Sequence, residues 1–270
     1  MATYNLTAAQ LRGTNGEGIL NSFEIPSSGG GGFTNLYSTE YDGVDDYIDC
    51  GDNDNLSFGD GTTDSPFSIS AWVKIPFGST GFYICSKQTE NSPPARDEYA
   101  FYISAADSKM TFFLFDLDVQ NRRGRTTDAI SLNNQWFHVA VTYSGVGGSS
   151  AQNGIKLYVN GVRSDTTDSN KNSYTAMHNT TSPFRIGFYT ETIITPSGNV
   201  DEVAIFTSEL SASDVVDIYN SGVPNNLNNL STPPLSWWRF EEGSGTTAID
   251  SGTGGNDGTL TNGTTYSTDV

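Results

Sequence analysis

The stretch Phe67-Ser-Ile-Ser-Ala-Trp-Val-Lys-Ile75 is apolar at every second residue from Phe67 onward. A period of two predicts a β-strand that buries one face. The stretch Trp136-Phe-His-Val-Ala-Val-Thr-Tyr143 repeats the pattern. Residues 155–159 do so as well, and they run into Asn160-Gly161, a pair typical of a tight hairpin turn. These segments predict antiparallel strands.

The alternation continues toward the end of the chain. It predicts further strands at residues 99–104, 110–118, 184–189, 200–206 and 235–241. Helical spacing occurs at Ser211–Tyr219, where Ser211 can cap a helix that carries an apolar stripe of Val215, Ile218 and Tyr219. About a dozen strands with one short helix predict an all-β, two-sheet antiparallel sandwich rather than a βαβ fold.

The charge of the chain excludes two classes of partner. Its 270 residues include 31 acidic and 13 basic side chains, for a formal net charge of −18. Nucleic acid and anionic membrane surfaces both need a basic face, and the largest basic cluster is Arg122-Arg123-Gly124-Arg125. No apolar run approaches the roughly 18 residues of a membrane span. The first residues lack signal-peptide features, so we expect synthesis in a cytoplasm or export by another route.

Residues 1–32 differ in composition from the rest of the chain. A short apolar segment is followed by Ser27-Ser-Gly-Gly-Gly-Gly32, a flexible linker. Such a segment cannot bury itself, so it is either a frayed terminus or a docking segment that folds against a partner or another copy. We favour docking, with six apolar anchors: Leu6, Leu11, Ile19, Leu20, Phe23 and Ile25. Residues 33–270 would form the domain.

Two cysteines, Cys50 and Cys85, are too few for a disulfide scaffold. Each lies in a strand-like run, and free cysteines are among the most often buried residues. We therefore interpret both as small buried apolar residues, and the sequence leaves open whether they pair.

Several stretches resemble a known family. Tyr41-Asp-Gly-Val-Asp-Asp-Tyr-Ile-Asp49 is similar to the opening signature of laminin-G-like domains, which are concanavalin A-like, pentraxin-related jelly rolls. Further similar stretches follow in the family's order, at residues 67–74, 134–143, 157–162, 185–187, 200–206 and 210–219. The resemblance covers roughly residues 37–220 and implies a jelly-roll sandwich.

The stretch Trp237-Trp-Arg-Phe-Glu-Glu-Gly-Ser-Gly245 departs from the family's pattern. A similar strand usually precedes the signature at residues 41–49, whereas here it comes last. Either a second module is truncated after one strand, or the strand order is circularly permuted. A solitary strand with exposed tryptophans would promote aggregation. We therefore favour permutation, with residues 235–260 supplying the strand usually found first.

The same arrangement is similar to laminin-G-like structural proteins of tailed phages of marine bacteria. That resemblance implies a non-catalytic virion surface protein, a capsid decoration or fibre component assembled in the host cytoplasm. Its partners would be other virion proteins, or copies of itself, through residues 1–32, together with host glycans bound weakly. The alternative is an extracellular bacterial carbohydrate-binding or adhesion module associated with polysaccharide degradation.

Catalytic patterns are missing from the sequence. Hydrolases on this fold use a Glu-x-Asp-x-x-Glu strand, and retaining hydrolysis needs two carboxyl groups about 5–5.5 Å apart. Asp201 and Glu202 lack that spacing and are expected to point to opposite faces of a strand. His138 lies within a strand and is expected to be packed, whereas His178 has no partner that the sequence identifies. We therefore predict that the protein is not an enzyme.

The segment Asp250-Ser-Gly-Thr-Gly-Gly-Asn-Asp-Gly258 offers carboxylate, amide and carbonyl oxygens on a bent loop, which are the ligands that calcium prefers. The resemblance implies a structural calcium near this loop, and the candidate ligands are Asp201, Asp250, Asn256 and Asp257. An ordinary turn that satisfies its own backbone accounts for the same residues. Both interpretations stay open.

Sugar recognition needs aromatic platforms beside polar groups. Four aromatic residues are predicted to lie in loops, and they are candidate carbohydrate contacts: Phe77, Phe82, Tyr174 and Tyr189. Each could instead close the core of the sandwich.

Overall fold

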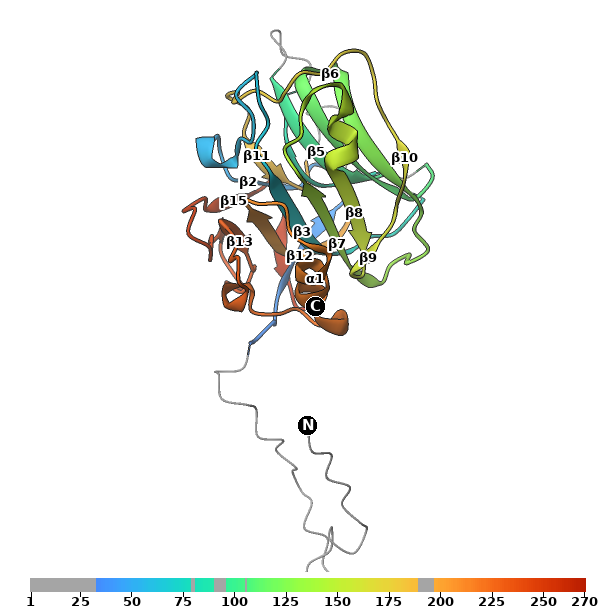
Figure 1. The fold of residues 1–270 in the computed structure, drawn as a ribbon. Coiled ribbons are helices and arrows are strands. Elements are labelled where there is room, and N and C mark those ends of the chain that lie inside the picture. Colours follow the sequence, from blue (N-terminus) through green and yellow to red (C-terminus); the bar gives the residue numbers. More distant parts are fainter. Residues whose placement is uncertain (1–32, 79–80, 90–95, 105, 189–196) are drawn as a thin grey trace, which may run out of the picture. The chain divides into compact units, whose positions relative to one another are not determined.

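The computed structural model describes residues 33–78, 81–89, 96–104, 106–188 and 197–270. Within residues 35–270, which form one unit, two antiparallel β-sheets pack face to face (Figure 1). The predicted all-β sandwich is confirmed. In the described ranges, no helix is long and apolar enough to cross a membrane.

The first sheet has the strand order β16-β1-β12-β3-β7-β8-β9, and β13 pairs with β12 beside this path. In β3 (Phe67–Lys74) the predicted apolar residues are all buried in the core. Asn160 and Gly161 join β8 to β9 with φ values of 49° and 76°, as a tight hairpin turn requires. The other strands are β1 (Ser38–Asp42), β7 (Trp136–Tyr143), β8 (Ile155–Val159), β9 (Val162–Arg163), β12 (Ser197–Phe206), β13 (Ser236–Trp238) and β16 (Thr265–Ser267).

The second sheet has the order β10-β6-β5-β4-β11-β2-β15-β14. Its longest strand, β6 (Lys109–Ala129), folds back along itself. The two halves lie side by side, as the hydrogen bond between the Thr111 and Thr126 hydroxyls at 3.0 Å shows. The predicted strand 110–118 is therefore the first half of a longer hairpin. The other strands are β2 (Tyr47–Asp49), β4 (Phe82–Lys87), β5 (Asp97–Ile103), β10 (Asp165–Asp168), β11 (Phe184–Ile186), β14 (Thr247–Ala248) and β15 (Gly258–Thr261).

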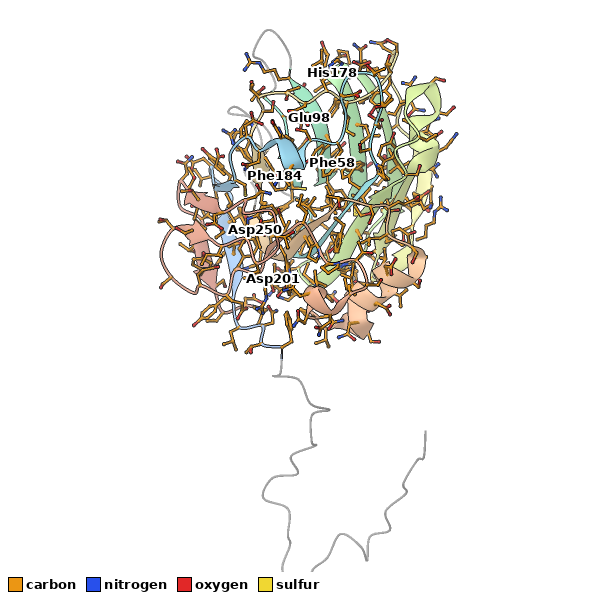
Figure 2. The ribbon with its side chains drawn as sticks, turned by 60° about the vertical axis from the view of Figure 1, so that its left-hand side comes forward. Phe58, Glu98, His178, Phe184, Asp201 and Asp250 are labelled. Carbon is orange, nitrogen blue, oxygen red and sulfur yellow. The ribbon has the colours of Figure 1, made fainter. Side chains whose placement is uncertain are left out.

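Aromatic side chains fill the core between the two sheets. Phe58 stacks on Phe67 with ring centroids 4.1 Å apart, and Phe184 stacks on Trp238 at 5.3 Å. Figure 2 labels Phe58 and Phe184 among the core side chains. The second contact joins β11 to the C-terminal part of the chain, so the core depends on residues far apart in sequence.

Both cysteines are free and buried. Burial raises the pKa of the Cys50 thiol and of the Cys85 thiol well above the usual range. The interpretation of both as small buried residues is confirmed, and the two do not pair.

The helix α1 (Ala212–Tyr219) lies where the sequence predicts it. A capping box holds its start, since the Ser211 side chain accepts from the Asp214 N–H and Asp214 accepts from the Ser211 N–H. Tyr219 stacks on Trp72 of β3 with ring centroids 5.9 Å apart, on the side of the first sheet away from the core. The described residues also contain the short 3₁₀ helices η1 (Asp54–Leu56), η2 (Gly148–Gly154), η3 (Asn220–Gly222) and η4 (Leu227–Asn229).

The C-terminal residues contribute strands to both sheets. β13 pairs with β12 and β16 pairs with β1 in the first sheet, whereas β15 pairs with β2 in the second. Residues 235–260 therefore lie within the sandwich as several short strands, where the sequence predicts one strand. The circular permutation relative to the family stays a prediction.

Candidate functional site

The second sheet carries a continuous row of side chains on its outer face. Asp49, Arg185, Ser86, Ala100 and Phe113 are register partners across five neighbouring strands, from β2 to β6. Directly paired residues point to the same side of a sheet. Their neighbours along these strands belong mostly to the core. Because side chains alternate along a strand, the row faces away from the core.

Aromatic rings gather at one end of this row. Tyr83 and Tyr102 stack with ring centroids 4.9 Å apart and ring planes 13° apart. The ring centroid of Phe113 lies 5.9 Å from that of Tyr102. The Arg122 guanidinium lies 4.5 Å from the centroid of the Phe113 ring, which is a cation–π contact. Tyr102 is half-buried, whereas Tyr83 and Phe113 are 7% and 8% exposed.

At the other end of this row, Arg185 lies at the centre of a second cluster of side chains. Its guanidinium lies 5.1 Å from the centroid of Tyr47 and 4.5 Å from that of Phe188. Its Nε donates to Asp49 Oδ2 at 3.0 Å. The Ser86 hydroxyl donates to the carbonyl oxygen of Phe188 at 2.8 Å, which ties this cluster to β4. Tyr47, Arg185 and Phe188 are all half-buried, so each retains some accessible surface.

We call this surface the outer aromatic face; it comprises Tyr47, Asp49, Tyr83, Tyr102, Phe113, Arg122, Arg185 and Phe188. Aromatic rings combine a large apolar area with a defined geometry, which suits the apolar C–H faces of sugar rings. Guanidinium groups donate hydrogen bonds and carboxylates accept them. An Arg–Asp pair can therefore donate to one hydroxyl group of a ligand and accept from another. Chemically, the surface can hold a ring-shaped polyhydroxyl compound.

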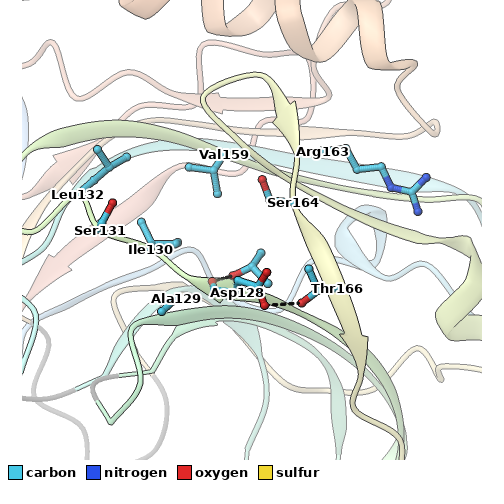
Figure 3. A pocket seen from close by; sticks show the side chains of 10 residues that line it. Asp128, Ala129, Ile130, Ser131, Leu132, Val159, Arg163, Ser164 and Thr166 are labelled. Atoms are coloured by element: carbon cyan, nitrogen blue, oxygen red, sulfur yellow. Dashed lines mark hydrogen bonds between the residues drawn. The ribbon is translucent and has the colours of Figure 1, made fainter.

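A groove of about 500 Å³ lies between the end of β6 and the segment that joins β8 to β10 (Figure 3). Its apolar lining includes Ile130, Leu132 and Val159, and its polar lining includes Asp128, Ser131, Arg163, Ser164 and Thr166. The Thr166 hydroxyl donates to Asp128 at 3.2 Å. The volume suits a small ligand, but none of the lining residues is aromatic, so the groove offers no ring for stacking.

The residues of the predicted calcium loop are hydrogen-bonded to one another and to β13. Asp250 accepts three backbone hydrogen bonds at 2.8–2.9 Å, from Trp237, Gly252 and Asn256. Asp257 in turn accepts from the Asp250 N–H at 2.8 Å. The described part of the chain contains no group of three or more Asp, Glu, His or Cys side chains placed to hold a metal. These hydrogen bonds agree with a turn that satisfies its own backbone, and the structural calcium stays a prediction.

Asp201 and Glu202 do not point to opposite faces of β12, contrary to the prediction from the sequence, because β12 is irregular at this point. The role of Asp201 as a calcium ligand stays a prediction. The Asp201 carboxylate accepts from the Asn35 amide and from the Glu202 N–H, both at 2.8 Å. A β-bulge between Asp201 and Ala204 interrupts the alternation of β12, and Glu202 has a φ of 52°. Both carboxylates therefore lie on the outer face of the first sheet. Figure 2 labels Asp201 and Asp250.

Two of the four aromatic residues predicted as sugar contacts are buried. Phe82 is a core residue of β4 and is 1% exposed, and Tyr174 is 4% exposed. The prediction is wrong for both, because neither ring can reach a ligand. Phe77 packs against the edge of the core. Tyr189 lies outside the described residues.

His138 is packed, as the sequence predicts. It is fully buried beside Trp72 and Tyr219, and burial lowers its pKa to about 3. His178 has a partner that the sequence does not identify, since its Nε2 lies 3.1 Å from Asp116 Oδ1. The six predicted docking anchors in residues 1–32 lie outside the described residues.

The sequence profile of a laminin-G-like family, described as the concanavalin A-like lectin/glucanases superfamily, matches residues 42–216. The chain belongs to this superfamily. The match covers more than half of the chain and ends before the C-terminal strands β13 to β16. No curated protein sequence matches the chain significantly.

Several solved structures are similar to this member of the superfamily at low sequence identity. A Bacteroides ovatus protein described as carbohydrate-binding is 19% identical with a TM-score of 0.55, over 88% of this chain and 61% of its own. The heptameric pentraxin of Limulus polyphemus is 14% identical with a TM-score of 0.49, over 85% of this chain and 94% of its own. The binding domain of botulinum neurotoxin serotype D is 18% identical with a TM-score of 0.46, over 68% of this chain and 43% of its own. The chain thus spans 61% of the first structure, and that likeness shows the fold.

The sequence contains one signal for the outer aromatic face. In Tyr99-Ala-Phe-Tyr-Ile103 and Thr111-Phe-Phe-Leu-Phe115, large apolar residues occupy both alternating sets of positions. Such strands bury both faces, so an aromatic surface on the side away from the core was to be expected there. Phe188, the neighbour of the predicted Tyr189, was missed as well, and nothing in its immediate sequence singles it out.

Proposed function

We propose that this chain is a non-catalytic glycan-binding module and that the glycan lies across the outer aromatic face. One observation carries the proposal: half-buried ring faces lie beside the Arg185–Asp49 pair on one side of the second sheet. The Bacteroides ovatus neighbour, which is described as carbohydrate-binding, supports it. The groove of Figure 3 is the competing location.

The geometry around Arg185 favours binding on an open surface. Two rings and Asp49 hold the guanidinium in place, so it loses little conformational freedom when it binds a hydroxyl group. Preorganisation of this kind lowers the entropic cost of association. An open sheet surface makes few contacts with a sugar. A lower entropic cost of association compensates for the small number of contacts.

We expect Arg185→Ala and Tyr102→Ala each to weaken glycan binding about tenfold, or ~1.4 kcal/mol, because each removes one anchor of the face. Arg185→Lys should lose most of the same affinity, since lysine keeps the charge but not the planar fork. Ligands would be found on a glycan array, and affinities would be measured by titration calorimetry.

The matched control for these variants is Arg163→Ala, which removes a half-exposed arginine of the groove and should leave binding unchanged. Melting temperatures would show that every variant is folded. Loss of binding in Arg163→Ala with retention in Arg185→Ala would move the ligand to the groove. If the full chain binds no glycan on the array, the proposed function is refuted.

We also propose that the module is displayed on a virion, as a capsid decoration or fibre component assembled in the host cytoplasm, with residues 1–32 as its anchor. The resemblance to phage structural proteins supports this, as does the distribution of charge. Residues 1–32 carry only Arg12, Glu17 and Glu24, whereas the whole chain has a net charge of −18. Repulsion between acidic domains is screened within about 8 Å at physiological salt. An extracellular bacterial adhesion module is the alternative.

Cleavage within Gly29–Gly32 is expected to release a folded domain that no longer binds particles stripped of the native protein, because the six apolar anchors leave with residues 1–32. Co-sedimentation of the cleaved and intact chains with such particles measures the effect, and an unchanged melting temperature is the control. If the cleaved domain rebinds as tightly as the intact chain, the anchor lies on the sandwich itself.

A further inference from the structure

The largest basic cluster of the sequence, Arg122-Arg123-Gly124-Arg125, is divided by the fold among three environments. Arg123 is 8% exposed and donates to backbone carbonyl oxygens at 2.9–3.1 Å. Arg125 is ion-paired with two aspartates of the β10 strand. Arg122 is the member of the cluster whose guanidinium lies over Phe113, so it belongs to the outer aromatic face.

The Arg122 guanidinium is held in place but has no acidic partner. Besides its contact with the Phe113 ring, its Nη1 donates to the carbonyl oxygen of Val119 at 2.9 Å. Its Nε is buried and has no hydrogen-bond partner. In the part of the chain that the structure describes, no acidic side chain is ion-paired with Arg122. A guanidinium carries five N–H donors and Arg122 is only half-buried, so donors remain for a ligand.

A second positive charge lies next to Arg122. Lys171 and Arg122 are register partners that exchange both backbone hydrogen bonds, each at 3.0 Å. In such a pair the Cα atoms are about 5.5 Å apart and both side chains point to the same side of the sheet. Lys171 is exposed and is not ion-paired with any described residue, whereas most other described basic side chains are ion-paired. Two positive charges without acidic partners therefore stand together beside the aromatic rings.

Tyr102 connects the two charges to the rest of the face. Burial raises the pKa of Tyr102 and the Arg122 charge opposes that rise, so the guanidinium lies close enough to act on the Tyr102 hydroxyl. Asp107 is the acidic group that also acts on Tyr102. It is exposed, so water and salt screen its charge. An anionic group bound beside Tyr102 would therefore meet mainly the positive charges.

The outer aromatic face is long enough for an oligosaccharide. Arg185 in β11 and Arg122 in the second half of β6 are separated by four strand spacings, through β4, β5 and the first half of β6. At about 4.8 Å per spacing, the two positions are roughly 19 Å apart across the strands. A ligand that contacts both is therefore a chain of several sugar units.

We propose that the ligand of the outer aromatic face is an acidic oligosaccharide, whose anionic substituent, a carboxylate or a sulfate ester, binds to Arg122 and Lys171. This inference rests on the glycan-binding function proposed above. The Arg122 guanidinium supplies planar N–H donors, and Lys171 supplies a compact charge. Hydrogen bonds between such groups and an anion are about twice as strong as neutral ones. Repulsion from distant acidic side chains is screened within about 8 Å at physiological salt, whereas these contacts act at shorter range.

Matched pairs of oligosaccharides test this inference with the full chain. The two members of a pair differ at one group: a free carboxylate against its methyl ester, or a sulfated hydroxyl against the free hydroxyl. Titration calorimetry should show about tenfold tighter binding of the acidic member in at least one kind of pair, because charged hydrogen bonds replace neutral ones. The preference should shrink as the salt concentration rises, since exposed charges are screened.

Substitution of the two basic residues should remove the preference. Arg122→Gln and Lys171→Gln should each lower the ratio of acidic to neutral affinity from about ten to below about three. The matched control is Lys156→Gln, which removes one positive charge from the first sheet and should leave the ratio near its original value. Melting temperatures would show that each variant is folded. Lys171 is exposed, so its variant decides if Arg122→Gln fails to fold.

The outcomes separate this inference from the proposed function. A preference within one kind of pair would support the inference and identify the substituent as a carboxylate or as a sulfate. Equal affinities within both kinds of pair would overturn the inference and leave glycan binding in place. A preference retained in full by both Arg122→Gln and Lys171→Gln would also overturn it, because the anion would then bind elsewhere. If the chain binds no glycan at all, the proposed function fails, and this inference fails with it.

Discussion

Deletion of every residue after Pro234 is expected to leave a chain that is insoluble or molten. Trp237, Trp238 and Phe240 are 1%, 0% and 0% exposed. Each such ring buries roughly 150–250 Å², which at about 25 cal/mol per Å² corresponds to roughly 4–6 kcal/mol. Their joint loss is comparable with the whole stability of a domain, about 5–15 kcal/mol.

The deletion would also remove partners from both sheets. Without β15 the strand β2 loses its neighbour on one side, and without β16 the strand β1 does. Solubility on expression, near-ultraviolet circular dichroism and dye binding would measure the outcome. Deletion of residues 1–32 is the control of similar size and should leave a soluble, folded domain. A chain ending at Pro234 that stays soluble with an unchanged melting temperature would mean that the C-terminal part does not belong to the sandwich.

The substitution Lys87→Met is expected to lower the free energy of unfolding by about 3–5 kcal/mol at pH 7, because it leaves a buried carboxyl group without its cation. The Lys87 and Glu98 side chains are fully buried, and Nζ lies 3.0 Å from Glu98 Oε1. The same Nζ lies 2.8 Å from Asp52 Oδ1 and 2.7 Å from the carbonyl oxygen of Ser182.

The effect of Lys87→Met should depend on pH. Burial already raises the pKa of Glu98, and removal of the lysine charge raises it further. A carboxyl group with a raised folded pKa is less costly when protonated, so the loss should shrink as the pH falls toward 4. Urea unfolding at both pH values measures it. Lys156→Met, which breaks a partly exposed pair with Glu209, should cost less than about 1 kcal/mol. An equal loss for the two variants would contradict the account.

Much of the fold follows from local sequence, since burial on one face leaves a period of two. The strand at Phe67–Lys74 and the helix with its Ser211–Asp214 box lie where the sequence predicts them. The bulge at Asp201 does not follow, because a single left-handed residue decides it and no glycine marks the position. The hairpin within β6 was missed because its second half, which includes residues 119–125, is polar and lacks alternation.

The candidate site was harder to predict than the fold. The outer aromatic face assembles register partners from β2, β11, β4, β5 and β6, whose order in the sheet differs from their order in the chain. Sequence spacing gives no information about that order. Loop position was also a poor guide to exposure, since Tyr174 lies outside the strands and is nonetheless buried, with its hydroxyl donating to Asp64 at 2.7 Å.

The location of a bound glycan is the most direct test of the central claim. The measurement is a nuclear magnetic resonance titration of the isotope-labelled full chain with a glycan identified on the array. The account predicts that the largest shift changes fall on Tyr47, Tyr102, Arg185 and Phe188, including the Arg185 side-chain Nε–H. Shift changes confined to residues 127–132 and 163–166, around the groove, would contradict it.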